Sequence, residues 1–183
     1  MLFRSSLGVS VDIARTAVNC APYVIAQVNP QIPRTHGDSF IHVKDLDVMV
    51  YADVPLPEVF YSAKVTETEL QVGRHVAELV DNRCCIQMGI GTIPDAVLTA
   101  LKNHSDLGVH SEMFSDGLLP LIESGVVSNA FKTKHPGKVV AAFALGTRKL
   151  YNYVNDNPLF SFLDVDYVND PHVIDRKSTR LNS

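Results

Sequence analysis

Residues 84–101 are Cys-Cys-Ile-Gln-Met-Gly-Ile-Gly-Thr-Ile-Pro-Asp-Ala-Val-Leu-Thr-Ala-Leu. The stretch 84–88 is apolar apart from Gln87, as is typical of a strand in a parallel sheet that is covered on both faces. Apolar residues then recur at helical spacing, at Ile93, Ala96, Val97, Ala100 and Leu101. Pro94 falls in the first turn of that helix, where its missing N–H is tolerated. The stretch therefore predicts a buried strand, a glycine turn and a helix.

The same alternation extends in both directions from this stretch. Thr66 and Glu69 have the spacing of a capping box that opens a helix running to Val80. Further strands are expected at 23–28, 41–43, 48–51, 139–145 and 159–168, and another begins at 107–110. Further helices are expected at 11–21, 116–124 and 147–155. Strands that alternate with helices predict an α/β fold, with a mostly parallel sheet and flanking helices.

Composition and charge exclude several classes of protein. Of the 183 residues, 46% are hydrophobic and 20% are charged, which is ordinary usage for a globular chain. The net charge of -4 gives no basic face for nucleic acid. No apolar run approaches the roughly 18 residues that a membrane span needs. We therefore expect neither a nucleic-acid partner nor a membrane partner.

The cysteines and the first residues indicate the cellular compartment of the protein. The three cysteines are odd in number, and Cys84 and Cys85 are neighbours, so we interpret all three as reduced thiols of an intracellular protein. The first six residues lack the apolar region of a secretory signal. A mitochondrial transit peptide is the alternative interpretation of these residues.

The glycine turn is the first candidate for chemistry. Gly89 and Gly91 between a strand and a helix let the main chain approach a ligand closely, and the first-turn N–H groups favour an anion or a polarised carbonyl. Ligands of open α/β sheets bind at the carboxyl ends of strands. The pattern is neither GxGxxG nor a P-loop, so no dinucleotide site is predicted. A purely structural turn is the alternative.

Glu112 is the second candidate, within Gly-Val-His-Ser-Glu-Met-Phe-Ser-Asp-Gly at 108–117. A carboxylate that ends the next strand would face the same cleft as the glycine turn. The alternative is a helix cap or dipole partner. His110 is either a general base or a satisfied structural histidine, and Asp116 is most simply an acid of a helix's first turn.

Five segments together carry a resemblance to a known family. They are 24–43 (VIAQVNPQIPRTHGDSFIHV), 89–97 (GIGTIPDAV), 107–117 (LGVHSEMFSDG), 135–151 (HPGKVVAAFALGTRKLY) and 164–171 (DVDYVNDP). In this order they resemble the acetyl-CoA hydrolase/transferase family, and within it the 4-hydroxybutyrate CoA-transferase branch. The resemblance covers about residues 7–174.

The resemblance implies roles for both motifs and a domain organisation. Glu112 matches the family's catalytic glutamate, and the turn of Gly89, Ile90, Gly91, Thr92 and Ile93 matches its CoA-contacting loop, whose amides would help to form an oxyanion hole. The family has a two-domain (NagB-like) CoA-transferase architecture with the active site between the domains. Residues 1–63 would end the N-terminal domain and include the linker, and residues 64–174 would begin the catalytic C-terminal domain. The fold would thus be incomplete in this chain.

The polar end at 175–183, Asp-Arg-Lys-Ser-Thr-Arg-Leu-Asn-Ser, has no period and follows the strand-like Val173 and Ile174. It resembles the translation of a sequencing adapter, so we expect a non-native tail. A frayed native terminus is the alternative.

By the same resemblance, the expected reaction moves coenzyme A between acetyl-CoA and a short carboxylate, such as acetate or 4-hydroxybutyrate, through a glutamyl-CoA thioester. Coenzyme A or acyl-CoA is then a substrate, and neither a metal nor a permanently bound cofactor is expected. An acetyl-CoA hydrolase and an inactive fragment are the alternatives. The full-length enzyme could be a homodimer, and its compartment would be mitochondrial in a eukaryote and cytoplasmic otherwise.

The remaining polar residues are interpreted as structural. Arg34, Thr35, His36 and Asp38 belong to a loop that either reaches the cleft or is solvated. Lys138 follows a turn, with a CoA phosphate as its alternative partner. Tyr151, Tyr153 and Asn155 are expected on the surface and end of a helix, and Cys84 and Cys85 as thiols of the core.

Overall fold

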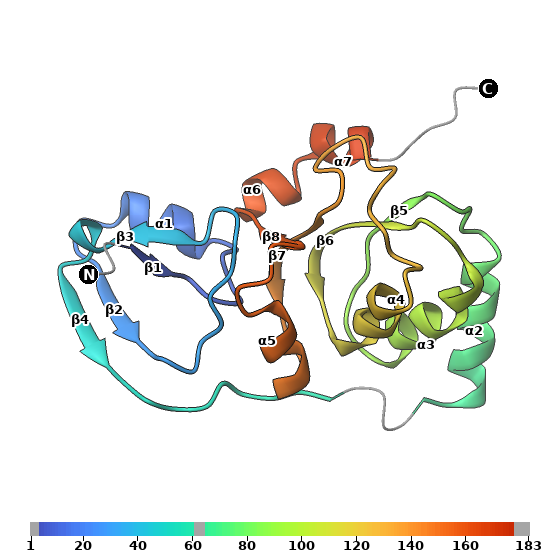
Figure 1. Ribbon diagram of the computed structural model, residues 1–183, viewed down its shortest axis with the longest axis horizontal. Coiled ribbons are helices and arrows are strands. Elements are labelled where there is room, and N and C mark those ends of the chain that lie inside the picture. The colour runs from blue at the N-terminus through green and yellow to red at the C-terminus, as the bar shows by residue number, and fades with distance from the viewer. Residues whose placement is uncertain (1–3, 61–64, 178–183) are drawn as a thin grey trace.

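A four-stranded parallel sheet forms the centre of the C-terminal part of the molecule (Figure 1). The structure, a computed structural model, describes residues 4–60 and 65–177. The strands are β5 (Cys85–Ile86), β6 (Gly108–Phe114), β7 (Val139–Ala144) and β8 (Phe160–Phe162), in that spatial order. All three pairings are parallel, which confirms the predicted α/β class.

Helices cover both faces of this sheet. They are α2 (Glu67–Ala77), α3 (Thr92–Ala100), α4 (Leu119–Glu123), α5 (Arg148–Val154), α6 (Val165–Val168) and α7 (Pro171–Lys177), with 3-10 turns η3 (Leu101–Asn103) and η4 (Asp116–Leu118). One core cluster joins Val139 and Ala141 of β7 to side chains of α3, α4 and α5. The other joins Val140 and Ala142 to Val168 of α6. The alternation of side chains along β7 therefore separates an α3 face from an α6 face.

The N-terminal part contains two small strand pairs and one helix. β1 (Arg4–Ser6) pairs antiparallel with β3 (Phe40–His42), and β2 (Ile25–Val28) pairs parallel with β4 (Val48–Tyr51). The helix α1 (Ala14–Cys20) and the 3-10 turn η1 (Val43–Asp45) connect them. Apolar side chains of the β2–β4 pair are exposed, Ile25 to 65% and Tyr51 to 71%.

Main-chain pairing joins the N-terminal part to the central sheet. Ser10 bridges antiparallel to Phe143, and Gly37 bridges parallel to Phe162. The amides of Val11 and Asp12 both donate to the Ala142 carbonyl at 3.1 Å. Val11 is completely buried in the core cluster on the α3 face. The first segment of the chain therefore completes the edge of β7 that the short strand β8 leaves open.

Most predicted elements occur, and the capping box is confirmed. The Thr66 amide donates to Glu69 Oε2 at 2.6 Å, and the Glu69 amide donates to Thr66 Oγ1 at 3.3 Å. The helix ends at Ala77, earlier than the predicted Val80, because the C-cap Glu78 and the turn after it bond back to residues 74–77.

Three element predictions are corrected. The strand expected at 84–88 spans Cys85–Ile86 only and is half-buried, because β5 is the edge strand of the sheet. The strand expected at 159–168 ends at Phe162, and Asp164 then caps α6 by accepting from the Asp166 amide at 3.0 Å. Val173 and Ile174 lie in helix α7, not in a strand.

Tyr151 is buried at 2% exposure, contrary to its predicted place on a helix surface. Its hydroxyl donates to the Pro57 carbonyl at 2.9 Å, and the Val59 amide donates to the Gly146 carbonyl at 3.0 Å. The sequence predicts a linker at 52–63, of which residues 61–63 lie outside the described residues. The part at 52–60 has no regular structure and packs against α5 through these contacts. No helix within residues 4–60 and 65–177 has the length and apolar character that crossing a membrane would require.

Candidate functional site

The glycine turn connects β5 to α3, as predicted. Gly91 is the N-cap residue of α3 and has a φ of 119°, a conformation that glycine adopts without strain. A Cβ atom on Gly91 would meet nothing within 4 Å, so the backbone conformation, not crowding, favours glycine here. The first helical bond runs from the Asp95 amide to the Gly91 carbonyl at 3.1 Å. The amides of Thr92 and Ile93 lie in the first turn, where a helix leaves N–H groups without helical partners.

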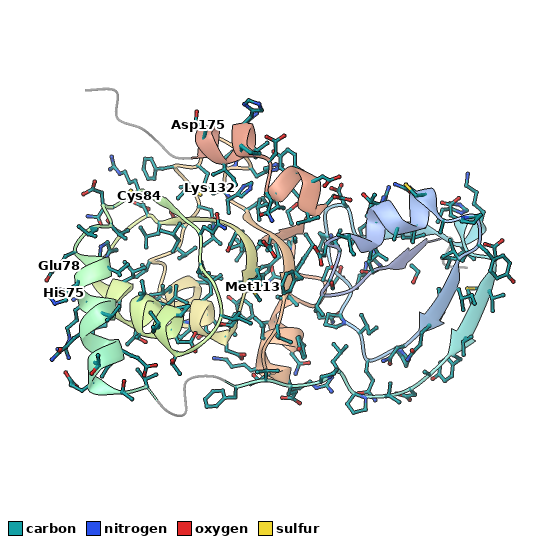
Figure 2. The ribbon with its side chains drawn as sticks, turned by 180° about the vertical axis from the view of Figure 1, so that it is seen from behind. His75, Glu78, Cys84, Met113, Lys132 and Asp175 are labelled. Carbon is teal, nitrogen blue, oxygen red and sulfur yellow. The ribbon has the colours of Figure 1, made fainter. Side chains whose placement is uncertain are left out.

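Glu112 lies in β6 and is half-buried. The Asn169 side-chain amide, which follows α6, donates to Glu112 Oε2 at 2.8 Å. Oε1 has no hydrogen-bond partner among the described residues. His110, two residues earlier, bonds through Nε2 to the Val168 carbonyl at 3.0 Å. Glu112 and His110 therefore both lie on the α6 face. Met113, next to Glu112, lies near the middle of the molecule (Figure 2).

The register of β5 and β6 makes the two motifs neighbours. Cys85 is opposite Gly108, and Ile86 is opposite Val109. Beyond this pairing, the Met88 amide donates to Ser111 Oγ at 3.1 Å, and Ser111 Oγ donates to the Met88 carbonyl at 2.8 Å. Since Met88 precedes Gly89 and Ser111 precedes Glu112, the start of the turn lies beside the main chain of Glu112.

The Glu112 carboxylate is not part of the cavity beside the turn. That cavity has a volume of about 230 Å³ and is mostly apolar, with Ile86, Met88, Gly89, Ile93, Pro94 and Val97 among its lining residues. Glu112 contributes nothing to its lining. The structure thus brings the two motifs together through the main chain, while the carboxylate contacts Asn169 on the α6 face.

Asp95 and Ser115 form a second link between the motifs, which the sequence does not predict. Ser115 Oγ donates to Asp95 Oδ1 at 3.3 Å, which ties the first turn of α3 to the residue after β6. Both residues are buried and line a cavity of about 450 Å³. Burial raises the pKa of Asp95 and the nearby Asp116 raises it further, whereas the bond from Ser115 lowers it. One feature of the sequence does indicate the burial of Asp95: it lies one turn before Leu98, on the apolar side of the helix.

Glu69 fixes the other side of the turn. Besides its place in the capping box, its carboxylate accepts a hydrogen bond from the Thr92 hydroxyl. The backbone hydrogen bond from Thr66, followed by the side-chain bonds from Thr92 and Thr66, lowers the pKa of Glu69. Helices α2 and α3 are therefore joined at their N-terminal ends by one carboxylate.

The other candidates have structural partners. The Asp116 carboxylate accepts from the Thr147 amide at 2.7 Å and from the Thr147 hydroxyl at 2.5 Å, which ties η4 to the start of α5. Lys138 Nζ donates to the Pro158 carbonyl at 2.5 Å. Arg34 and His36 contact Asp156 at 3.5 Å and 3.1 Å.

The remaining candidates are Thr35 and the two adjacent cysteines. Thr35 is buried and donates to the Gly8 carbonyl at 2.7 Å. Cys84 and Cys85 are half-buried free thiols. Within the described ranges, no cluster of three or more His, Cys, Asp or Glu could hold a metal ion.

Two family profiles match the chain. The acetyl-CoA hydrolase/transferase N-terminal domain matches residues 4–59, and the C-terminal domain of the same family matches residues 146–183. The second match includes the polar end 175–183.

Curated relatives match nearly the whole chain. A 4-hydroxybutyrate coenzyme A transferase of Clostridium kluyveri is 50% identical over 169 residues, covering 92% of this chain and 39% of that protein. A succinyl-CoA:acetate/propanoyl-CoA:succinate CoA transferase of Fasciola hepatica is 45% identical and covers 97% of this chain and 38% of that protein. The chain therefore spans about two fifths of the length of these relatives.

Solved structures agree with the fold. A 4-hydroxybutyrate CoA-transferase of Porphyromonas gingivalis superposes with a TM-score of 0.90 at 42% identity, covering 94% of this chain and 44% of that chain. RipA of Yersinia pestis superposes with a TM-score of 0.89 at 38% identity, covering 96% of this chain and 41% of that chain.

Proposed function

The chain belongs to the acetyl-CoA hydrolase/transferase family, and on this premise we propose that the whole protein transfers coenzyme A between an acyl-CoA and a carboxylate, with Glu112 as the nucleophile. The names of the Clostridium kluyveri and Fasciola hepatica relatives support a transfer of coenzyme A. Residues 1–63 then supply the end of one domain with its linker, and residues 64–174 supply the first part of the catalytic domain.

The observation that carries this proposal is the position of Glu112 beside the glycine turn. The Ser111–Met88 bonds bring Gly89, which follows the end of β5, to the main chain of Glu112, which lies two residues before the end of the parallel strand β6. Asn169 holds Oε2 of the carboxylate, so Oε1 is the oxygen that attacks. The acyl carbonyl then has to bind between Oε1 and the amides of the turn, which would donate to the developing oxyanion.

The proposed reaction has two steps, which the incoming carboxylate then reverses. Oε1 attacks the thioester carbonyl, the C–S bond breaks, and a mixed anhydride and the CoA thiolate form. The thiolate attacks the glutamyl carbonyl, which releases the first carboxylate and leaves a γ-glutamyl-CoA thioester. The incoming carboxylate reverses both steps. This is covalent catalysis, in which one difficult exchange is divided into easier steps.

A carboxylate is a weak nucleophile, so placement and oxyanion donors must lower the barrier. A single oxyanion donor is typically worth about 2.7–4 kcal/mol. Acetyl-CoA is the proposed donor substrate, with acetate or 4-hydroxybutyrate as the acceptor. The second candidate function is hydrolysis, in which water takes the acyl group or cleaves the glutamyl-CoA.

Replacement of Glu112 tests the proposal in the whole protein. Glu112→Ala removes the attacking oxygen, so exchange of CoA between acetyl-CoA and labelled acetate should fall by at least about 1,000-fold. Circular dichroism should show an unchanged fold, because the side chain is only half-buried. Glu123→Ala is the matched control, since Glu123 is an exposed acid of α4 that pairs with Lys149 at 3.4 Å. Exchange at a near-normal rate in Glu112→Ala would remove Glu112 from the role.

Trapping identifies the covalent residue and separates the two functions. Borohydride treatment of the acyl-CoA-loaded enzyme should reduce a thioester on Glu112, and a label on another residue would contradict the assignment. CoA release is then followed with and without added acetate. Exchange that requires acetate indicates a transferase, release without acetate indicates a hydrolase, and neither activity indicates an inactive piece.

A further inference from the structure

Ser111 is a buried hydroxyl beside the proposed nucleophile, and it takes no part in the bond-making and bond-breaking steps of the proposed reaction. We propose that Ser111 is a positioning residue, which fixes the glycine turn at the distance from Glu112 that the reaction needs. This inference rests on the proposed function of the site. It assigns to Ser111 no contact with substrate.

The first step of the argument is the early end of β5. The strand pairing stops at Ile86 opposite Val109, so no further ladder residue of β5 holds the chain beside β6. Main-chain groups beyond this point need other partners, because buried N–H and C=O groups without hydrogen bonds are costly. Ser111 supplies both partners for Met88, accepting from its amide at 3.1 Å and donating to its carbonyl at 2.8 Å.

The second step is the adjacency of the residues. Ser111 is completely buried and follows strand alternation, so its side chain lies on the opposite side of β6 from that of Glu112. One peptide bond separates Ser111 from the nucleophile, and one separates Met88 from the first glycine of the turn. Any shift of Met88 relative to Ser111 therefore changes the position of the turn amides relative to Glu112.

The third step is the fixation of the opposite side of the turn. Thr92 is bonded to Glu69, and Asp95 accepts from Ser115 at 3.3 Å. Gly89 and Gly91, between these anchors and Ser111, have little around them: a Cβ atom on Gly89 would meet only Pro94 Cγ, at 3.7 Å. On the entry side of the turn, the Ser111 hydroxyl bonds to both main-chain groups of Met88 and so anchors the chain just before Gly89.

A positioning role predicts a loss of turnover that exceeds any loss of stability. Ser111→Ala removes both bonds without adding volume, and small misplacements of reacting groups cost up to about 100-fold in rate. In the whole enzyme we expect kcat for CoA exchange to fall about 10- to 100-fold in this variant. KM for acetyl-CoA should stay within about twofold, because remote contacts dominate the binding of a large substrate.

Ser128→Ala is the matched control. Ser128 Oγ likewise bonds to a main-chain amide, that of Ala130 at 3.2 Å, and to Asp106 at 3.0 Å, away from the glycine turn. Both variants should lower Tm by similar amounts, but only Ser111→Ala should lower kcat. Ser111→Cys keeps a group that can accept and donate weakly, so its kcat should lie between those of the wild type and Ser111→Ala.

Each outcome bears on one proposal. A wild-type enzyme without exchange would overturn the proposed function. Wild-type exchange that is abolished in Glu112→Ala but unchanged in Ser111→Ala would overturn the positioning role alone. A fall in kcat that is equal in Ser111→Ala and Ser128→Ala would also overturn it, because a general loss of stability would then explain the effect. A fall that is equal in Ser111→Ala and Ser111→Cys would overturn it too, because a partly retained hydrogen bond at position 111 would then restore no activity.

Discussion

The carboxylate of Glu112 is held by one oxygen only. Asn169 donates to Oε2 at 2.8 Å, and the described residues leave Oε1 without a partner. Glu112 was identified from the HSEM segment, but Asn169 was not, because the two residues are 57 positions apart and lie on different elements. A contact of that kind depends on how α6 returns to the sheet. Sequence spacing alone contains no information on it.

Asn169→Ala should weaken catalysis if this contact orients the nucleophile. Hydrogen bonds to charged groups contribute about 1.5–3 kcal/mol, so kcat for exchange should fall about 10- to 100-fold. Asn169→Asp should be worse, since a second carboxylate would repel Glu112. Exchange kinetics of both variants check this, with Asn152→Ala on the exposed side of α5 as the control. Equal kcat values in Asn169→Ala and the wild type would show that the contact does not orient Glu112 for attack.

Asp95 gives a pH-dependent prediction at the same scale. Burial raises the pKa of its carboxyl and Asp116 raises it further, against the lowering effect of Ser115. The folded state therefore binds this proton more tightly than the unfolded chain does, so Asp95 reduces the free energy of unfolding as the pH rises above about 4. Asp95→Asn should raise Tm at pH 7, and the gain should shrink as the pH approaches about 4. An increase in Tm from Asp95→Asn that becomes larger as the pH is lowered would contradict this prediction.

At the scale of elements, the close contact of α2 with α3 positions the turn. Gly73 lies in the buried side of α2, and a Cβ atom there would come within 2.7 Å of the Ala96 main chain in α3. The capping box that begins α2 also contributes Glu69, which binds Thr92 in the first turn of α3. The two helices thus place the glycine turn together.

Gly73→Ala should destabilise the protein although alanine favours helices. The gain in helix propensity is about 1 kcal/mol, whereas a forced separation of packed main chains typically costs about 1–3 kcal/mol. We expect a net loss that lowers the urea midpoint. Gln71→Ala, at an exposed position of the same helix, is the control and should leave the midpoint nearly unchanged. A midpoint of Gly73→Ala above that of the wild type would show that α2 and α3 can separate freely.

At the scale of the whole molecule, the two parts of the chain share one sheet edge. Gly37 has a φ of 100°, and its Cβ would lie 2.3 Å from the Phe162 carbonyl oxygen. The Phe162 amide donates to the His36 carbonyl at 2.8 Å, and the Asp38 amide donates to the Phe162 carbonyl at 2.8 Å. The sequence predicts a loop around Arg34 and Asp38, and the loop is irregular as expected, but nothing in the sequence predicts that it pairs with β8 at Gly37.

Gly37→Ala should therefore disturb the junction between the parts. Gly137→Ala is the matched control, because Gly137 also has a positive φ, 72°, but no atom within 4 Å of its Cβ position. Both variants incur backbone strain, and only Gly37→Ala adds a main-chain clash, so it should lose about 1–3 kcal/mol more. Calorimetry should show a single transition for the wild type. Equal losses in the two variants, or separate transitions in the wild type, would contradict a shared core.

Local rules determined much of this protein. The capping box, the glycine turn and the α/β order follow from hydrogen-bonding side chains, backbone conformation and apolar periodicity, which act over a few residues and can be read from the sequence. The place of a strand at the edge or in the centre of a sheet cannot be predicted by such local rules. The half-buried state of β5, the end of β8 at Phe162 and the burial of Tyr151 depend on which strand lies at an edge and which segment packs against a helix.

The same distinction between local rules and tertiary packing applies to the candidate site. Through residue type and resemblance, the sequence predicts that Glu112 and the turn at 89–93 carry the chemistry of the site. Only the tertiary structure decided that Ser111 joins them, that Asn169 holds the carboxylate and that Asp95 is buried. The reason is physical: a hydrogen bond between residues distant in the chain exists only after packing has placed both elements, and its distance is set by that packing.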